Sequence, residues 1–391
     1  MPGININDTG ASMNGTMNGL NRTPAVKTKG PAAVEVTPAR LQKLSDPSLF
    51  ISDAFIDGRW EQKDSTFNVV VATILCLENG KTFAEAEGEI LYAASFTSWF
   101  AEEATRSYGD TIPSSTANTT VMTVMQPIGV CGIITPWNFP AAMITRKVGP
   151  ALAAGCACVI KPPSETPHTY LALTKLAIEV GIDGNSAAME LVENPLVKKI
   201  SFTGSTPVGK LLSRAAAGTI KKMSLELGGN APFIIFDDAD LALAVDGVML
   251  SKFRCFGQTC VCANRILVQE NVIEEFTDHL VAKVRALKMA CGFDEDVTQG
   301  PLVNRAATDK VAAHVKDAVE RGAKVYISGS APLNGGFFFE PTVMTGVTSE
   351  MLVAKDETFG PLAPIFSFKT EDEAVAISND TEFSLAGYFF S

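Results

Sequence analysis

The chain has 391 residues, of which 46% are hydrophobic and 19% charged, and its formal net charge is -11. This composition is typical of a globular protein, and the length predicts two domains, because one hydrophobic core rarely serves more than about 250–300 residues. The acidic balance argues against a nucleic-acid partner, and no apolar stretch is long enough to predict a membrane span. Eight cysteines in so long a chain predict free thiols in a reducing compartment.

The first 43 residues differ in composition from the rest of the chain. They are rich in Asn, Gly, Thr and Met with almost no apolar periodicity, so we expect residues 1–43 to be a disordered tail. This segment lacks the apolar stretch of a secretory signal, but it is poor in acidic residues and carries a few basic ones. We therefore expect a cytoplasmic protein, with a mitochondrial address as the alternative.

Residues 111–129 are polar and β-prone and predict an exposed ribbon, after which short apolar stretches alternate with helical ones. We expect strands at 130–135, 156–161, 198–204, 231–236, 264–270 and 324–329, helices at 141–155, 169–181, 208–217 and 241–253, and a strand, a helix and a strand before residue 391. This alternation predicts α/β units, in which parallel sheets are covered by helices on both faces. The break between two such units is expected near residues 226–230.

Two segments carry the residue types of a covalent reaction. Residues 257–265 read GQTCVCANR, and residues 226–230 read ELGGN. A cysteine can add to a carbonyl and leave after an acyl group has formed, so Cys260 is the predicted nucleophile. Glu226, expected among apolar neighbours, is the predicted general base for the water that attacks the acyl group. The alternatives are a buried structural cysteine and a solvated glutamate at a strand end.

An asparagine and a glycine-containing turn complete the predicted site. Asn138, in TPWNFP after an apolar strand, is the predicted donor to the alkoxide that forms when a thiolate adds to an aldehyde, together with the backbone N–H of Cys260. Gly204 and Gly209 bracket GSTPVG, where a strand passes into a helix whose N-terminus can bind a phosphate. This segment is not the GxGxxG pattern of dinucleotide-binding proteins. The alternatives are a turn asparagine and an ordinary capped helix.

The segments ELGGN, GQTCVCANR, TPWNFP and FTGS together resemble the aldehyde dehydrogenase family, and GQTCVCANR is similar to its succinate-semialdehyde branch. The resemblance runs from about residue 50 to 391. It implies a Rossmann-type cofactor-binding domain over residues 44–226, in which the ribbon helps to assemble subunits, and an α/β catalytic domain over residues 227–391. It also implies oxidation of succinate semialdehyde to succinate, a step of 4-aminobutyrate degradation, through a thiohemiacetal and a thioester on Cys260. The alternatives are another small or carboxylated aldehyde, or a catalytically inactive family member.

The resemblance implies NADP+ or NAD+ as cofactor. Lys161, at the end of a predicted strand, would hold the adenosine ribose. Ser164 stands where NAD-preferring relatives often carry Glu, which would repel a 2′-phosphate, so NADP+ is allowed and favoured. The implied cofactor-binding residues are Trp137, Lys161, Ser164, Gly204, Ser205, Thr206, Val208, Gly209, Leu227, Glu357 and Phe359.

The resemblance assigns two further roles. Arg146 and Arg254 would anchor the substrate carboxylate, because guanidinium groups bind carboxylates through paired hydrogen bonds; the alternative is a pair of solvated helix arginines. Cys262 would form a strained, reducible bridge to Cys260 that stops turnover; the alternative is a small core residue. No metal site is expected, since the three histidines have no ligand spacing with the cysteines. The expected partners are a small aldehyde and, in the family, copies of the same chain in a homotetramer.

The resemblance also has gaps. A strand and two helices of the family are missing after residues 67–71 (FNVVV), and an apolar strand of the cofactor sheet is missing after residues 179–185 (EVGIDGN). We expect this second gap to remove a central ladder partner and to expose apolar faces. The chain ends before the family's closing catalytic segment and intersubunit strand, which argues against the homo-oligomer. Cys255 stands where relatives usually carry Asn, a change expected to alter the substrate tunnel.

Overall fold

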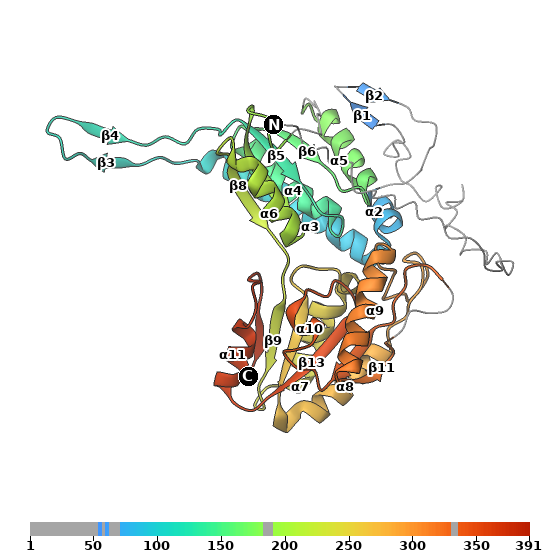
Figure 1. The fold of residues 1–391 in the computed structure, drawn as a ribbon. Coiled ribbons are helices and arrows are strands. Elements are labelled where there is room, and N and C mark those ends of the chain that lie inside the picture. Colours follow the sequence, from blue (N-terminus) through green and yellow to red (C-terminus); the bar gives the residue numbers. More distant parts are fainter. Residues whose placement is uncertain (1–53, 57–58, 62–70, 183–190, 330–334) are drawn as a thin grey trace, which may run out of the picture.

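The computed structural model describes residues 54–56, 59–61, 71–182, 191–329 and 335–391. The predicted disordered tail, residues 1–43, lies outside the described residues. The described chain forms two large sheets covered by helices, and a two-stranded ribbon projects from the first of them (Figure 1). The predicted α/β fold is confirmed. No helix in these described ranges is both long and apolar enough to cross a membrane.

The first sheet has four parallel strands in the order β6-β5-β7-β8. Its elements are β5 (Val130–Ile134), α4 (Pro140–Ala153), β6 (Ala157–Lys161), α5 (Pro167–Glu179), β7 (Val197–Thr203), α6 (Thr206–Ala217) and β8 (Lys222–Glu226). The sequence predicted β5, β6 and β7 to within one residue at each end. It did not predict β8, because β8 is an edge strand on which three of five residues are exposed and no apolar run marks it.

The family strand that is missing between α5 and β7 would belong to the edge of this sheet and not to its centre. β5 pairs with β6 on one side and with β7 on the other, so the ladder from β6 to β8 is continuous. The chain passes from β5 through α4 to β6, which is the edge strand of the described sheet. A second right-handed crossover, from β6 through α5, would continue in the same direction and place a further strand outside β6. The expected loss of a central strand is therefore wrong for the described residues.

Two helices that precede the ribbon lie against the first sheet's helices. They are α2 (Val71–Asn79), which contacts α5, and α3 (Phe83–Glu103), which contacts α4. The hydroxyl of Thr82 accepts the N–H of Glu85, and the Glu85 carboxylate accepts the N–H of Thr82, which together fix the N-terminus of α3. A short 3-10 turn (Ala104–Arg106) then ends the helical hairpin.

Two small antiparallel pairs lie outside the large sheets. One joins β1 (Ala54–Ile56) and β2 (Arg59–Glu61), and the other joins β3 (Thr111–Pro113) and β4 (Thr120–Met122). Every residue of β3 and β4 is exposed, and the pair extends away from the body of the molecule (Figure 1). The ribbon therefore presents both of its faces to the surroundings.

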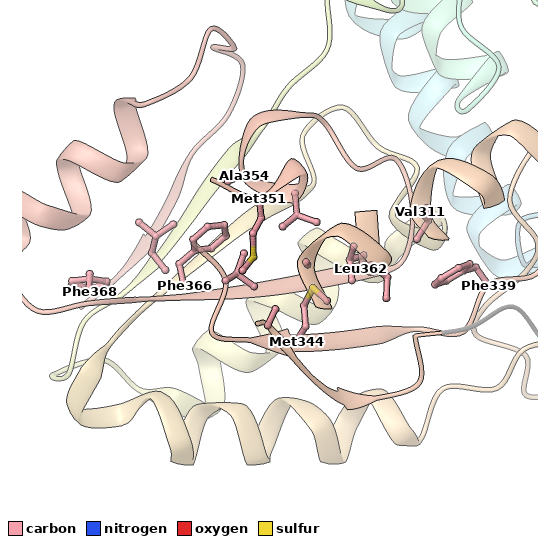
Figure 2. Packing of buried hydrophobic residues seen from close by; sticks show 14 of the residues in the cluster. Val311, Phe339, Met344, Met351, Ala354, Leu362, Phe366 and Phe368 are labelled. Carbon is pink, nitrogen blue, oxygen red and sulfur yellow. The ribbon is translucent and has the colours of Figure 1, made fainter. Parts of the chain in front are cut away.

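The second sheet has six strands in the order β11-β12-β13-β10-β9-β14, all parallel to their neighbours except β11 and β12. Its strands are β9 (Ala231–Ile235), β10 (Ala263–Gln269), β11 (Lys324–Ile327), β12 (Thr342–Thr345), β13 (Leu362–Phe368) and β14 (Tyr388–Phe390). Its helices are α7 (Leu241–Val248), α8 (Ile273–Arg285), α9 (Arg305–Glu320), α10 (Leu352–Lys355) and α11 (Glu371–Asn379). Side chains such as Val311, Met344, Leu362 and Phe366 fill the core on one face of this sheet (Figure 2).

The helix expected over residues 241–253 ends earlier than predicted. α7 stops at residue 248 and the next five residues form a π-helix, a form frequent at functional sites. The chain then turns sharply, because residues 255–257 all have positive φ, between 48° and 73°. Gly257 is required at this turn, since a Cβ there would lie 2.0 Å from the carbonyl oxygen of Gly360. The turn leads directly to Cys260.

Candidate active site

A cavity of about 570 Å³ is lined by residues from both halves of the chain. The carboxyl ends of β7 and β8 and the loop after β5 contribute from the first sheet, and the loop before β10 contributes from the second. The predicted site residues that line it are Trp137, Asn138, Arg146, Gly204, Ser205, Glu226, Leu227, Arg254, Cys260, Glu357 and Phe359. The fold thus brings the predicted nucleophile, base and amide together, although up to 122 positions (260 − 138) separate them in the sequence.

Cys260 lies in a tight turn against the second sheet. Its carbonyl oxygen packs on Gly229, where a Cβ would approach to 2.2 Å, so the ELGGN segment needs a glycine at this position. Burial, together with the carboxylates of Glu226 and Glu357, raises the pKa of the Cys260 thiol to about 11. The thiol is therefore protonated at neutral pH, and addition to a carbonyl requires that it lose this proton.

Glu226 is the last residue of β8 and pairs in register with Thr203 of β7. The Thr203 hydroxyl donates to its Oε2 atom at 3.2 Å, and an Arg146 nitrogen lies 3.4 Å from its Oε1 atom. The prediction that Glu226 has apolar surroundings is wrong, because two cations and a hydroxyl group lie beside its carboxylate. The leucines on either side in the sequence do not determine this environment, since successive strand residues point to opposite faces.

Lys147 is a site residue that sequence reasoning missed. Its Nζ atom lies 4.0 Å from Glu226 Oε2, and its side chain is 8% exposed. Burial lowers the pKa of Lys147 to about 8, against the opposing effect of Glu226. The sequence feature that could have indicated Lys147 is its position next to Arg146 on the helix that follows WNFP. Only the fold shows that both cations lie beside the same carboxylate.

Asn138 is almost completely buried, and its Nδ2 atom donates to the carbonyl of Gln258 at 2.8 Å. Its own backbone carbonyl accepts a hydrogen bond from Lys81 Nζ at 2.9 Å. The preceding carbonyl, of Trp137, accepts from the side chain of Asn79 at 2.9 Å. The loop before Cys260 thus holds the amide side chain of Asn138, and α2 together with the segment between α2 and α3 holds its backbone.

Lys81 and Glu89 form a buried ion pair that supports Asn138. Both side chains are at most 1% exposed. Glu89 also accepts the N–H groups of Ala141 and Ala142, at 2.9 and 3.3 Å, at the start of α4. A carboxylate at a helix N-terminus is favourable because it complements the helix dipole. The pair was missed from the sequence, where Lys81 is an ordinary lysine after an Asn-Gly turn.

The two predicted anchor arginines lie over different aromatic rings. The Arg146 guanidinium lies 5.7 Å from the ring centre of Phe96, and that of Arg254 lies 5.1 Å from the ring centre of Phe139. Arg254 remains exposed, while Arg146 is partly buried. Both guanidinium groups border the cavity, where the only carboxylate within an ion-pair distance in the described structure is Glu226, to Arg146.

Except for Glu357 and Phe359, the predicted cofactor residues lie at or just beyond the carboxyl ends of the first sheet's strands, where ligands bind in open α/β sheets. α6 begins at Thr206, directly after β7, so its first N–H groups lack partners within the helix and can bind a phosphate. Gly209 allows α6 to approach Leu227, since a Cβ there would lie 2.5 Å from that side chain. These features fit a dinucleotide. Five of the assigned residues do not line the cavity around Cys260, namely Lys161, Ser164, Thr206, Val208 and Gly209, and of these Ser164 and Val208 are exposed.

Glu357 and Phe359 approach the cavity from the second half of the chain. Glu357 Oε1 accepts the N–H of Gly229 at 3.0 Å, and burial raises the pKa of its carboxyl. The rings of Phe359 and Trp137 meet edge to face, with centres 5.8 Å apart. Lys252, which is fully buried, holds this segment through the carbonyl of Thr358 at 3.4 Å and was also missed from the sequence.

Cys262 does not line the cavity. It is completely buried, and its sulfur lies 3.9 Å from the carbonyl of Lys252. Both Cys260 and Cys262 are free thiols in this structure. No disulfide joins them, and the redox switch stays a prediction.

Comparisons with known proteins match this site and fold. The aldehyde dehydrogenase family model matches residues 68–391. A glutarate-semialdehyde dehydrogenase of Pseudomonas aeruginosa is 54% identical over 331 residues, which cover 82% of this chain and 68% of that protein. The NADP(+)-dependent succinate-semialdehyde dehydrogenase GabD of Escherichia coli is 54% identical over 331 residues, 82% of this chain and 69% of that protein. The crystal structure of succinate-semialdehyde dehydrogenase from Burkholderia pseudomallei superposes with a TM-score of 0.86 at 45% identity, covering 89% of this chain and 87% of that one. This chain belongs to the aldehyde dehydrogenase family.

Proposed function

We propose that this protein oxidises succinate semialdehyde to succinate with NADP+ or NAD+ as hydride acceptor, the oxidation step of 4-aminobutyrate degradation. The observation that carries the proposal is one cavity in which Cys260, Glu226 and Asn138 lie with two guanidinium groups. Two similar enzymes are named for glutarate semialdehyde and succinate semialdehyde, and both of these aldehydes end in a carboxylate. Arg146 and Arg254 supply the charge that such a substrate needs.

In the first step, Cys260 adds to the aldehyde. Its thiol gives up a proton to solvent water as the sulfur–carbon bond forms, and the carbonyl oxygen becomes an alkoxide. The Asn138 amide has two N–H groups, one of which is donated to Gln258, and the other can donate to this alkoxide. One such donor is typically worth about 3 kcal/mol in the transition state. The carboxylate end of the substrate is held at Arg146 and Arg254.

In the second step, the adduct on Cys260 is oxidised and released. Glu357 and Phe359 would hold a nicotinamide that would supply the hydride acceptor, and loss of a hydride from the adduct would leave a thioester on Cys260. Glu226 then takes a proton from water, the water oxygen adds to the thioester carbon, and the carbon–sulfur bond breaks to free the acid. Lys147 and Arg146 lie beside Glu226 and orient its carboxylate.

Cofactor binding and catalysis are assigned to the two halves of the chain, each of which contains one large sheet. We place cofactor binding on residues 44–226, with the helix start at Thr206 for the diphosphate and Lys161 for the adenosine ribose. Residues 227–391 supply Cys260 and, through Glu357 and Phe359, the contacts to the nicotinamide end. The exposed position of Ser164 supports acceptance of a 2′-phosphate.

Assembly and regulation of the enzyme rest on surface features. The ribbon of β3 and β4 exposes Ile112, Val121 and Met122, an apolar surface that supports assembly with other copies of the chain. Oxidation of Cys260 and Cys262 to a disulfide would stop turnover, and a reductant would restore it. We place the protein in the cytoplasm.

The experiment that tests the proposed function compares three aldehydes of similar length. Succinate semialdehyde, glutarate semialdehyde and uncharged butanal are supplied with NADP+, and reduction of the cofactor is followed by absorbance. We expect kcat/KM for succinate semialdehyde to exceed that for butanal by at least about tenfold, since hydrogen bonds to charged groups contribute about 1.5–3 kcal/mol. Equal kcat/KM values for all three aldehydes would refute the role of the arginines. A higher kcat/KM for glutarate semialdehyde would show that this aldehyde, and not succinate semialdehyde, is the preferred substrate.

A further inference from the structure

A tyrosine outside the cavity contacts the turn that carries the nucleophile. The Tyr388 hydroxyl donates a hydrogen bond to the carbonyl of Val261 at 2.8 Å. Val261 lies between Cys260 and Cys262, so this bond fixes the peptide group next to the reactive thiol. Tyr388 itself comes from β14, which follows α11 and is 127 residues away in the sequence.

The position of the Tyr388 ring is determined by the second sheet. β14 pairs with β9 so that Tyr388 is the register partner of Phe233. The two rings lie 5.5 Å apart, and Phe390 stacks on the same Phe233 at 5.1 Å. Phe233 is 1% exposed, so its ring is a fixed support. The pairing of β14 with β9 and the contact with Phe233 therefore position the Tyr388 hydroxyl against the turn.

Two further contacts restrain the turn on either side of Val261. The N–H of Cys262 donates to the carbonyl of Thr259 at 3.0 Å, and the Cys260 carbonyl packs against Gly229. Neither of these restrains the Val261 carbonyl, which the Tyr388 hydroxyl binds from another strand. Burial raises the pKa of Tyr388, so the phenol keeps its proton and remains a donor at neutral pH.

We propose that Tyr388 is a positioning residue, which holds the turn so that the Cys260 sulfur stays in the cavity that Glu226 and Glu357 also line. This proposal rests on the proposed function in that the attack by Cys260 on an aldehyde is the step that needs the position. A thiol released from this position leaves a desolvated site beside two carboxylates. It then reacts more readily with a small reagent in solution but less readily with an aldehyde held by Asn138 and the arginines.

The test uses the full chain with Tyr388→Phe, which keeps the ring and removes the hydroxyl, and Tyr326→Phe as the matched control on β11. We expect kcat to fall about tenfold with KM within about twofold, because a misplaced nucleophile loses rate and not substrate binding. We expect alkylation of Cys260 by iodoacetamide at pH 7.5 to accelerate at least about threefold, since the thiol gains solvation and its apparent pKa falls. The control changes neither rate.

Opposite changes in turnover and alkylation distinguish positioning from general destabilisation. Mass spectrometry must show the label on Cys260 and not on the buried Cys262, and a thermal melt must show a folded variant. Unchanged kcat and unchanged alkylation overturn the proposal, as does a fall in both rates together. If the wild-type protein oxidises no aldehyde, the proposed function fails, and the alkylation rate alone decides the role of Tyr388.

Discussion

A guanidinium nitrogen of Arg146 lies 3.4 Å from Oε1 of Glu226, so the predicted anchor for the substrate contacts the predicted base. Lys147, the next residue of α4, lies near the other oxygen of the same carboxylate. A substrate carboxylate that binds Arg146 competes with Glu226 for this guanidinium. Under the proposed function, substrate binding and the freedom of the base are therefore coupled through one side chain.

This coupling predicts different effects for the two arginines. Arg146→Met and Arg254→Met should each raise KM for succinate semialdehyde by about 10–100-fold, because each removes a charged hydrogen-bond donor. Only Arg146→Met should also change kcat for uncharged butanal, since only Arg146 contacts Glu226. Steady-state kinetics with both aldehydes measure this. Identical behaviour of the two variants toward butanal would contradict the coupling.

Variants of the nucleophile and the base should separate the two halves of the reaction. Cys260→Ala should abolish turnover, while Glu226→Gln should still form an acyl-enzyme and fail to hydrolyse it, because addition of the thiol precedes activation of water. Intact-mass spectrometry after one exposure to aldehyde and cofactor detects the adduct. A folded Glu226→Gln protein without an adduct would show that Glu226 has another role.

The reactivity of Cys260 should depend on pH over an unusually high range. Because the pKa of its thiol is raised to about 11, alkylation by iodoacetamide in the absence of cofactor should rise about tenfold per unit from about pH 7 to pH 10. Glu226→Gln removes a nearby negative charge, which should lower this pKa and accelerate alkylation at pH 7.5. Cys260→Ala is the control for labelling elsewhere, and a rate that levels off near pH 8 would refute the raised pKa.

The buried pair of Lys81 and Glu89 should be essential for stability. Lys81→Met leaves Glu89 as a buried, unpaired carboxylate, so we expect a loss of about 3–5 kcal/mol in the free energy of unfolding. Lys316→Met removes an equivalent contact between exposed residues, Lys316 and Glu320, and should change stability little. Urea denaturation followed by circular dichroism compares the two variants. Equal stability in both would mean that Lys81 contributes only to the position of Asn138.

The cofactor preference should depend on one exposed residue. The wild-type protein should reduce NADP+ at least as readily as NAD+, because Ser164 leaves room for a 2′-phosphate near Lys161. Ser164→Glu should raise KM for NADP+ through charge repulsion and leave KM for NAD+ nearly unchanged. A wild-type enzyme that uses NAD+ and ignores NADP+ at saturating aldehyde would exclude this interpretation.

Most strands with apolar runs were predictable from the sequence, but β8 and β12 were missed. β5, β7, β9 and β10 are buried along most of their length, which requires runs of apolar residues that are visible in any window. β8 lies at a sheet edge and needs no such run, and β12 has only four residues, two of them threonines, so neither strand shows a clear apolar run. The π-helix before Arg254 was likewise invisible, because local periodicity does not distinguish it from a continued α7.

The sequence by itself determined the chemical groups of this protein, since the motifs around Cys260, Glu226 and Asn138 specify residue types that one reaction needs. Only the tertiary structure decided their surroundings. The cations beside Glu226 come from a helix about 80 positions earlier, and the ion pair under Asn138 joins the loop before α3 to α3 itself. A carboxylate's environment is set by groups within a few ångströms, and in a folded α/β protein these groups are mostly distant in the chain.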